Sequence, residues 1–163
     1  MRVLGIDPGL NVTGYSILDV HDRAIKLVEA GVVRTNPHAE MGERLSEIAG
    51  EIGRVIAQFS PDALAVEELY SHYDHPKTAI IMGHARGVIF LKAAEAGLSI
   101  FPYASTRIKK SLTGNGRASK EQVQRMIRST LNLLEVPEPP DVADALAIAL
   151  CHCRSLEHQE VLS

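Results

Sequence analysis

The segment that decides the fold is RVLGIDPGLNVTGYSILDV, residues 2–20 of a chain of 163 residues. Residues 2–7 form a short apolar run that predicts a strand, and residues 8–11 hold the proline, glycine and asparagine typical of a turn. Residues 12–20 are apolar and β-branched, which predicts the returning strand of a hairpin. A third strand is predicted over 27–35. Because no helix interrupts these strands, we expect an antiparallel meander.

Helices and single strands alternate after this meander. Apolar residues spaced three and four positions apart predict an amphipathic helix over 41–59. Short apolar runs predict strands over 63–66 and 98–103. Apolar and capping patterns predict three more helices, over 77–96, over 120–134 behind a Ser119 cap, and over 141–155. These elements describe one α/β domain, residues 1–158, with a mixed five-stranded sheet flanked by helices and a short C-terminal tail over 159–163.

The composition is that of an ordinary globular protein. With 45% hydrophobic and 23% charged residues, the chain resembles neither a disordered segment nor a coiled coil. It has no apolar run long enough to cross a membrane, and Asp7 comes too early for a signal peptide. Two cysteines, Cys151 and Cys153, are too few for a disulfide framework. We expect a cytosolic protein with reduced cysteines.

Four acidic residues stand where their side chains can meet. Asp7 and Glu67 each end an apolar segment, and the C-terminal ends of parallel strands gather at one edge of a sheet. Asp141 and Asp144 begin the last predicted helix three residues apart, on one face. Carboxylates that converge repel one another unless a cation lies among them, and hard oxygen ligands suit Mg²⁺ or Mn²⁺. Two such ions would support phosphodiester hydrolysis.

Structural roles stay open for each acid taken alone. Asp141 can cap the last helix, and both helix acids complement its macrodipole. Asp7 and Glu67 end apolar strands, where a capping role does not apply, although a salt bridge to lysine or arginine would also account for them.

Positive charge is concentrated in residues 103–132, which carry seven basic residues and one acid, Glu121. The formal charge of the whole chain is −3, so the remaining residues are strongly acidic. This division is expected where one face binds a polyanion, although a solvated helix face gives the same pattern. From charge alone, Lys110 and Arg117 are candidate contacts to nucleic acid.

Four segments together resemble the RuvC family of Holliday-junction resolvases, in the right order over nearly the whole chain. These segments are Ile6-Asp7-Pro8-Gly9, Ala65-Val66-Glu67, GHARGV over 83–88 and DVADALAIA over 141–149. A single strand ending in Asp-x-Gly is a weak signal, since the actin and sugar-kinase ATPases share it. All four segments at matching spacing are highly specific.

This resemblance implies a ribonuclease-H-like fold and a homodimer, each subunit of which nicks one strand of a four-way DNA junction during recombination and repair. The family's catalytic acids fall on Asp7, Glu67, Asp141 and Asp144, which would hold two Mg²⁺ ions per subunit, with Mn²⁺ as a substitute. The family has histidine at the position of Asp141 in some relatives. Hydrolysis would leave a 5′-phosphate and a 3′-hydroxyl that a ligase can reseal.

The resemblance also gives the basic segment a role. The family's DNA-contacting lysines fall on Lys109 and Lys120, and Tyr70 takes the place of an aromatic, often phenylalanine, that helps to open the junction by stacking on bases. Packing alone would also account for Tyr70. The family further implies a branch-migration helicase as partner and a place in the bacterial cytosol, at the nucleoid while acting, with no membrane.

The same residues also admit other functions. An ATPase of the actin or sugar-kinase type needs two lobes and further glycine-rich loops, which 163 residues do not hold. A non-catalytic junction-binding module would use the basic segment while the acids are structural. A related nuclease acting on RNA–DNA hybrid or flaps would have the same metal site. The small-residue helix around Gly83 and Gly87 could be a dimer contact or could pack on the sheet.

Overall fold

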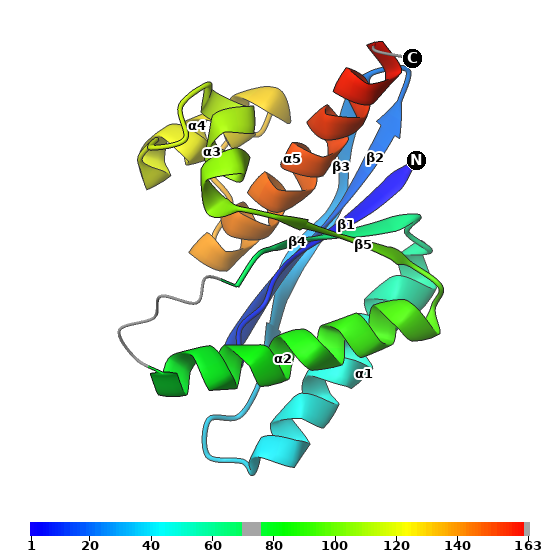
Figure 1. Cartoon of the computed structure of the whole chain (residues 1–163), viewed down its shortest axis with the longest axis vertical. Helices are drawn as coiled ribbons and strands as arrows, with labels where there is room; N and C mark the ends of the chain where they lie inside the picture. The colour runs from blue at the N-terminus through cyan, green and yellow to red at the C-terminus, as the bar shows by residue number, and fades with distance from the viewer. Residues whose placement is uncertain (70–75, 162–163) are drawn as a thin grey trace.

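The computed structural model describes residues 1–69 and 76–161, with side chains up to residue 156. Its centre is a five-stranded sheet in the order β3-β2-β1-β4-β5 (Figure 1). The first three strands form the predicted antiparallel meander, and β4 and β5 run parallel to β1, so the sheet is mixed. The strands are β1 Arg2–Asp7, β2 Val12–His21, β3 Ala24–Arg34, β4 Ala63–Glu67 and β5 Ser99–Tyr103.

Helices cover both faces of this sheet. They are α1 Met41–Phe59, α2 Pro76–Glu95, α3 Ser105–Thr113, α4 Lys120–Thr130 and α5 Pro140–Val161. Side chains of a strand alternate between its two faces, so Leu4 and Ile6 pack under α1 and α2, whereas Val3 packs under α5. Two hydrophobic cores result, one on each side of the sheet. No helix in the described ranges is long and apolar enough to cross a membrane.

Several boundaries differ from the predicted ones for local reasons. β3 begins at Ala24 because Asp22 and Arg23, with φ of 49° and 66°, form a tight two-residue turn that lacks the usual Asn-Gly signal. α4 stops at Thr130 because Asn132 takes a left-handed conformation with φ of 52°, and the Leu133 N–H then closes onto the Arg128 carbonyl, as in a Schellman motif.

Two further differences concern helices. The basic stretch after β5 forms the helix α3. This helix was not predicted from the sequence, because only Ile108 and Leu112 mark its buried side. Gly114, at φ 79°, ends that helix. The last helix continues to Val161, past its predicted end near Ser155 and through most of the predicted tail, because neither glycine nor proline follows to end it.

The start of α5 lies directly on the backbone of β1 and β2. A Cβ atom at Gly5 would stand 2.4 Å from the Ala145 carbonyl oxygen, and one at Gly14 would stand 2.0 Å from the Asp141 carbonyl oxygen. The Ser16 hydroxyl donates to the Ala145 carbonyl at 3.0 Å. These contacts leave room only for hydrogen at both glycines, and they place the acidic first turn of α5 beside the end of β1.

Candidate active site

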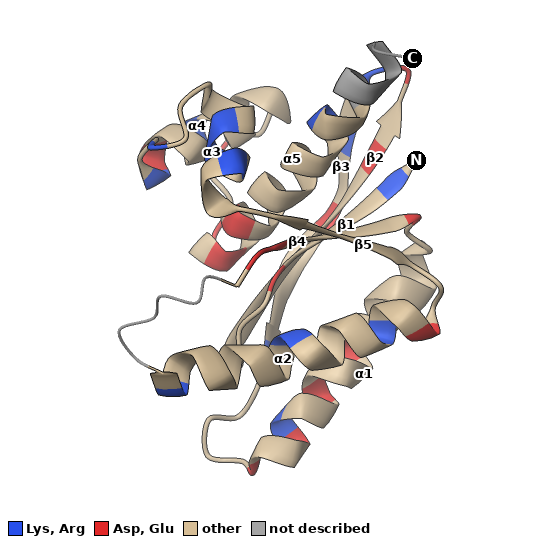
Figure 2. Ribbon diagram, viewed as in Figure 1, with Lys and Arg blue, Asp and Glu red and all other residues tan. Residues whose placement is uncertain are grey.

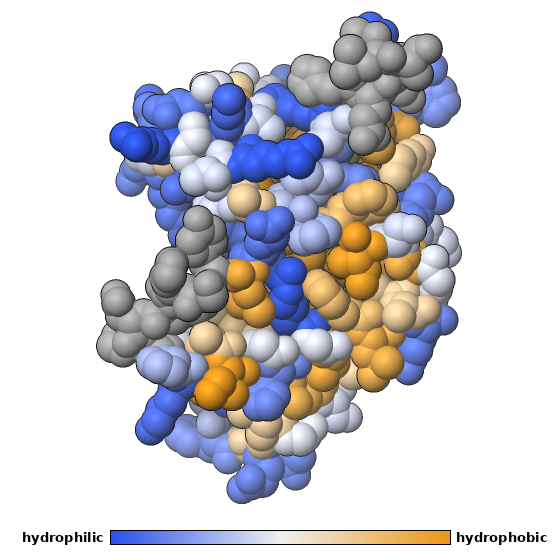
Figure 3. All heavy atoms as spheres, viewed as in Figure 1, coloured by the Kyte–Doolittle hydropathy of each residue, from blue (hydrophilic) through white to orange (hydrophobic). Residues whose placement is uncertain are grey.

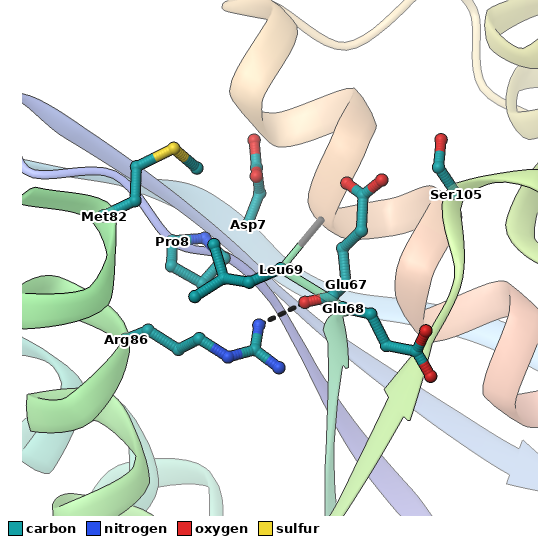
Figure 4. Close-up of a pocket in the computed structure, with 8 residues that line it drawn as sticks. All are labelled: Asp7, Pro8, Glu67, Glu68, Leu69, Met82, Arg86 and Ser105. Atoms are coloured by element: carbon teal, nitrogen blue, oxygen red, sulfur yellow. Dashed lines mark hydrogen bonds between the residues drawn. The ribbon is translucent and has the colours of Figure 1, made fainter. Parts of the chain in front are cut away.

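The C-terminal ends of β1 and β4 carry the first two acids of the site. The strands pair in parallel with Ile6 opposite Val66, so the next step places Asp7 beside Glu67. Figure 4 shows both carboxylates pointing to the same side of the sheet, toward α5, whereas the neighbouring Glu68 points away from them. Alternation along β4 therefore selects Glu67 as the acid of this segment that faces the site.

The first turn of α5 supplies the other two acids. Figure 2 shows its acidic start lying close to the acidic ends of β1 and β4, with the basic helices α3 and α4 alongside. Lys120 begins α4, and its Nζ lies 3.4 Å from an Asp144 carboxylate oxygen. Both side chains are partly exposed, so this ion pair is open to competition from other cations.

Asp7 experiences the field of the other three acids. Burial is the main cause that raises the pKa of Asp7 to about 7, and the charges of Asp144, Glu67 and Asp141 raise it further. Lys120 acts in the opposite direction. A carboxylic acid ordinarily ionises near pH 4, so Asp7 holds its proton to a higher pH than usual, and a nearby cation would favour its ionised form.

Two further acids of the site have raised pKa values. For Glu67 the main cause is burial, which the Ser105 hydroxyl opposes by donating a hydrogen bond to the carboxylate, and Lys109 opposes by its charge. For Asp144 the main cause is again burial, and Lys120 opposes it. The site therefore contains desolvated carboxylates whose charge is only partly balanced by nearby lysines.

The donor set fits a hard divalent cation by its chemistry. All four acids offer carboxylate oxygens, and their mutual repulsion at Asp7 is the electrostatic cost that a bound cation would relieve. As the side chains lie, no three His, Cys, Asp or Glu residues in the described ranges form a ready-made metal cluster. Metal binding at this site therefore requires the carboxylates to turn toward one another.

Two hollows of about 200 and 230 Å³ meet at the site. Glu67 and Ser105 line both of them. The first hollow reaches from Asp7 toward α2, and the second passes Asp144 toward Lys109 and Lys120. The acids therefore lie between Arg86 in the first hollow and Lys109 and Lys120 in the second.

The candidate DNA-contacting residues fall into three groups. Lys109 and Lys120 line the second hollow beside the acids. Lys110 at the end of α3 and Arg117 in the following turn are exposed, and neither lines the two hollows. Tyr70 lies outside the described residues.

Sequence reasoning missed two residues that contact Glu67. Ser105 is the first residue of α3, directly after β5 at the same edge of the sheet, and this position was the available signal. Arg86 lies within the GHARGV segment, and its guanidinium donates to the carbonyl oxygen of Glu67 (Figure 4). No sequence pattern indicates that contact.

Comparisons of the sequence with known proteins point to a single family. The family model described as "Crossover junction endodeoxyribonuclease RuvC" matches residues 3–152. A RuvC from Rhodopirellula baltica is 52% identical over 149 residues, which cover 91% of this chain and 84% of that protein. A RuvC from Alkaliphilus oremlandii is 43% identical over 155 residues, covering 95% of this chain and 94% of that protein.

Solved structures agree with this match. Thermus thermophilus RuvC in complex with a Holliday junction substrate is similar with a TM-score of 0.92 and 36% identity, covering 98% of this chain and 96% of that one. The yeast mitochondrial Holliday junction resolvase is similar in fold, with a TM-score of 0.70 at 14% identity. The predicted α/β, ribonuclease-H-like fold with its mixed five-stranded sheet is confirmed.

Proposed function

The chain belongs to the RuvC family of crossover junction endodeoxyribonucleases, and from this premise we propose how its residues resolve Holliday junctions. The endonuclease activity is that of the family. We assign hydrolysis to the cluster of Asp7, Glu67, Asp141 and Asp144, with Mg²⁺ as the cofactor, two ions per subunit, and Mn²⁺ as a substitute. The observation that carries this proposal is the placement of the acids: the parallel register puts Asp7 beside Glu67, and the first turn of α5, with Asp141 and Asp144, packs directly on β1 and β2.

The proposed mechanism of hydrolysis follows from the groups that would surround the scissile phosphate. When bound, divalent cations supply an activated water and stabilise the leaving oxygen of an in-line displacement. Asp7 and Glu67, held at strand ends, and Asp141 and Asp144, held by α5, would ligate these ions. Lys109 and Lys120 would hold the neighbouring phosphates, so that the strand lies across the acids. The products are a 5′-phosphate and a 3′-hydroxyl.

The decisive experiment compares DNA structures of one sequence. The purified protein is incubated with Mg²⁺ and a mobile four-way junction, a duplex, a flap or an RNA–DNA hybrid, with EDTA as control. Paired nicks that ligase reseals, confined to the junction, are expected. Cutting of the hybrid or the flap instead would favour a related nuclease that shares the metal site. Tight junction binding without cutting would favour a binding module.

Lys109→Ala is expected to weaken junction binding and to lower the slope of log affinity against log salt by about one. The reason is that Lys109 lines the hollow that leads away from Glu67 and Asp144, where a backbone phosphate would lie. Fluorescence anisotropy with labelled junction in EDTA, at several salt concentrations, measures both quantities. Arg54→Ala is the matched control, because Arg54 lies on α1 and pairs with Glu51. An unchanged slope would remove Lys109 from the DNA-binding face.

We propose that the homodimer forms through the outer face of α2. Ala85, Ile89 and Ala93 bury one side of this helix against the sheet. On the opposite side Ile80 is 61% exposed and Leu91 57% exposed. Gly83 and Gly87 have open space at their Cβ positions, so another backbone could approach closely. Figure 3 shows apolar side chains gathered over α2 and the adjacent β5, where Phe101 is also exposed.

Leu91→Glu is expected to convert the dimer into a monomer at micromolar concentrations, because it places a charge in the apolar face that would be buried. Size-exclusion chromatography with light scattering measures the mass. Leu134→Glu is the matched control, since Leu134 is 92% exposed outside α2 and its variant should keep the dimer. A Leu91→Glu protein that remains dimeric would refute this interface.

We further propose that a branch-migration helicase delivers the junction, and that the protein acts in the bacterial cytosol at the nucleoid. The support for both is the family membership. Tyr70 is proposed, on the same ground, to open the junction by stacking.

A further inference from the structure

The peptide group between Glu67 and Glu68 is held at both of its ends by different elements. The Glu68 N–H donates to the Tyr103 carbonyl of β5 at 2.9 Å. In a trans peptide the carbonyl points opposite to the N–H, so the Glu67 carbonyl points toward β1. This carbonyl accepts from the Arg86 guanidinium (Figure 4).

The strand β1 cannot supply a hydrogen bond to that carbonyl. In a parallel pair, a carbonyl accepts from the N–H of the residue that follows its partner on the neighbouring strand. The register of β1 and β4 makes Asp7 the partner of Glu67, so the residue that follows is Pro8. Proline has no backbone N–H. The β1–β4 ladder therefore lacks a backbone hydrogen bond to the Glu67 carbonyl at the site. The Arg86 guanidinium, on α2, supplies the missing donor.

The Arg86 guanidinium makes a second contact, with the ring of Phe90. Its guanidinium lies over the Phe90 ring, 4.7 Å from the centroid, one turn further along α2. It lines the first hollow together with Asp7, Pro8 and Glu67, and its charge lowers the pKa of Glu67. The side chain thus contacts the backbone of Glu67 while its charge acts on the carboxylate.

We propose that Arg86 is a positioning residue, which orients Glu67 for metal binding by completing the hydrogen bonding of the β1–β4 edge where Pro8 cannot. The inference rests on the proposed function, since it assumes that Glu67 is a metal ligand. Removing the donor leaves a half-buried carbonyl unpaired and frees the Glu67–Glu68 peptide to rotate. Partners that orient a ligand in this way typically account for about 10- to 100-fold in metal affinity or activity.

The test uses Arg86→Met, which keeps the aliphatic stem but removes the donors, and Arg86→Lys, which keeps a donor. Binding of Mn²⁺ to the DNA-free protein is followed by electron paramagnetic resonance of the free ion. Junction binding is measured in EDTA, and cleavage is measured at saturating junction. Circular dichroism checks folding, and Lys92→Met is the control on the same helix, where Lys92 pairs with Glu95.

For Arg86→Met we expect Mn²⁺ affinity and cleavage rate each to fall about tenfold or more, with junction affinity unchanged and partial recovery of cleavage at high Mn²⁺. Arg86→Lys should lie between this variant and the wild type. Unchanged Mn²⁺ affinity in a folded Arg86→Met protein would overturn the inference, as would a loss of junction binding equal to the loss of cleavage. A wild-type protein that neither binds Mn²⁺ nor cuts the junction would overturn the proposed function as well.

Discussion

Asp7→Asn is expected to leave the protein able to bind a four-way junction but to lower its cleavage rate by about a thousandfold or more. The substitution keeps the shape of the side chain and removes the charge that a divalent cation requires at the centre of the acidic cluster. Binding should persist because the basic residues Lys109 and Lys120 come from α3 and α4 rather than from β1. Gel-based cleavage in Mg²⁺ and anisotropy in EDTA measure the two activities separately.

The same variant has a second expected property, which concerns stability without metal. The pKa of Asp7 is about 7 in the folded protein, well above its ordinary value of 3.8. A carboxyl whose pKa is raised by folding costs no stability below its unfolded pKa, and the cost grows as pH rises through the folded pKa. Asp7→Asn should therefore raise the thermal midpoint in EDTA, and more at about pH 8 than at about pH 5.

Two outcomes would contradict these expectations. Appreciable nicking by Asp7→Asn would remove Asp7 from the catalytic centre. An equal change in thermal midpoint at both pH values would show that folding does not raise the pKa of Asp7. Asp19→Asn and Asp22→Asn are unsuitable as controls, because Asp19 pairs with Arg2 and Asp22 with His21. Glu47→Gln is suitable, since Glu47 is exposed on α1.

Gly14→Ala is expected to lower both the stability and the activity, although Gly14 itself touches neither metal nor DNA in the proposed mechanism. The added Cβ would lie 2.0 Å from the Asp141 carbonyl oxygen, so β2 and the start of α5 must separate. Overpacking of this kind costs about 1–3 kcal/mol. Displacing Asp141 and Asp144 by about 1 Å should lower cleavage by about a hundredfold. Urea denaturation and junction cleavage measure the two effects.

Gly50→Ala provides the opposite expectation in the same protein. Gly50 lies inside α1 with no atom within 4 Å of its Cβ position, and alanine there should raise stability by about 0.5–1 kcal/mol without changing cleavage. If Gly14→Ala were as harmless as this control, the close packing of α5 on β2 would not be what positions the two aspartates.

Much of this site could be predicted from the sequence, because its acids occupy positions with strong local rules. Asp7 and Glu67 follow short apolar runs, and parallel strands bring such ends together. Asp141 and Asp144 stand at the beginning of a helix with one continuous apolar stretch behind them. The meander was predictable because consecutive strands joined by short turns most often pair in sequence as hairpins.

Other features depend on contacts between segments distant in the chain, which no local pattern records. The bond from Arg86 to the Glu67 carbonyl depends on α2 crossing the end of β4, and that crossing depends on tertiary packing. The helix α3 has a weak apolar signal because one side faces solvent and the site. The turn at Asp22 and Arg23 requires positive φ at both residues, which aspartate tolerates but arginine rarely adopts.

The helix α2 has a proposed role on each of its two sides. One side carries Arg86, which donates to the Glu67 carbonyl and is proposed to orient that residue, and the other side is the face proposed to meet a second copy of the chain. A single helix therefore lies between the proposed dimer face and the peptide that carries Glu67, so contact with a second copy of the chain and support of the acidic site would share one element.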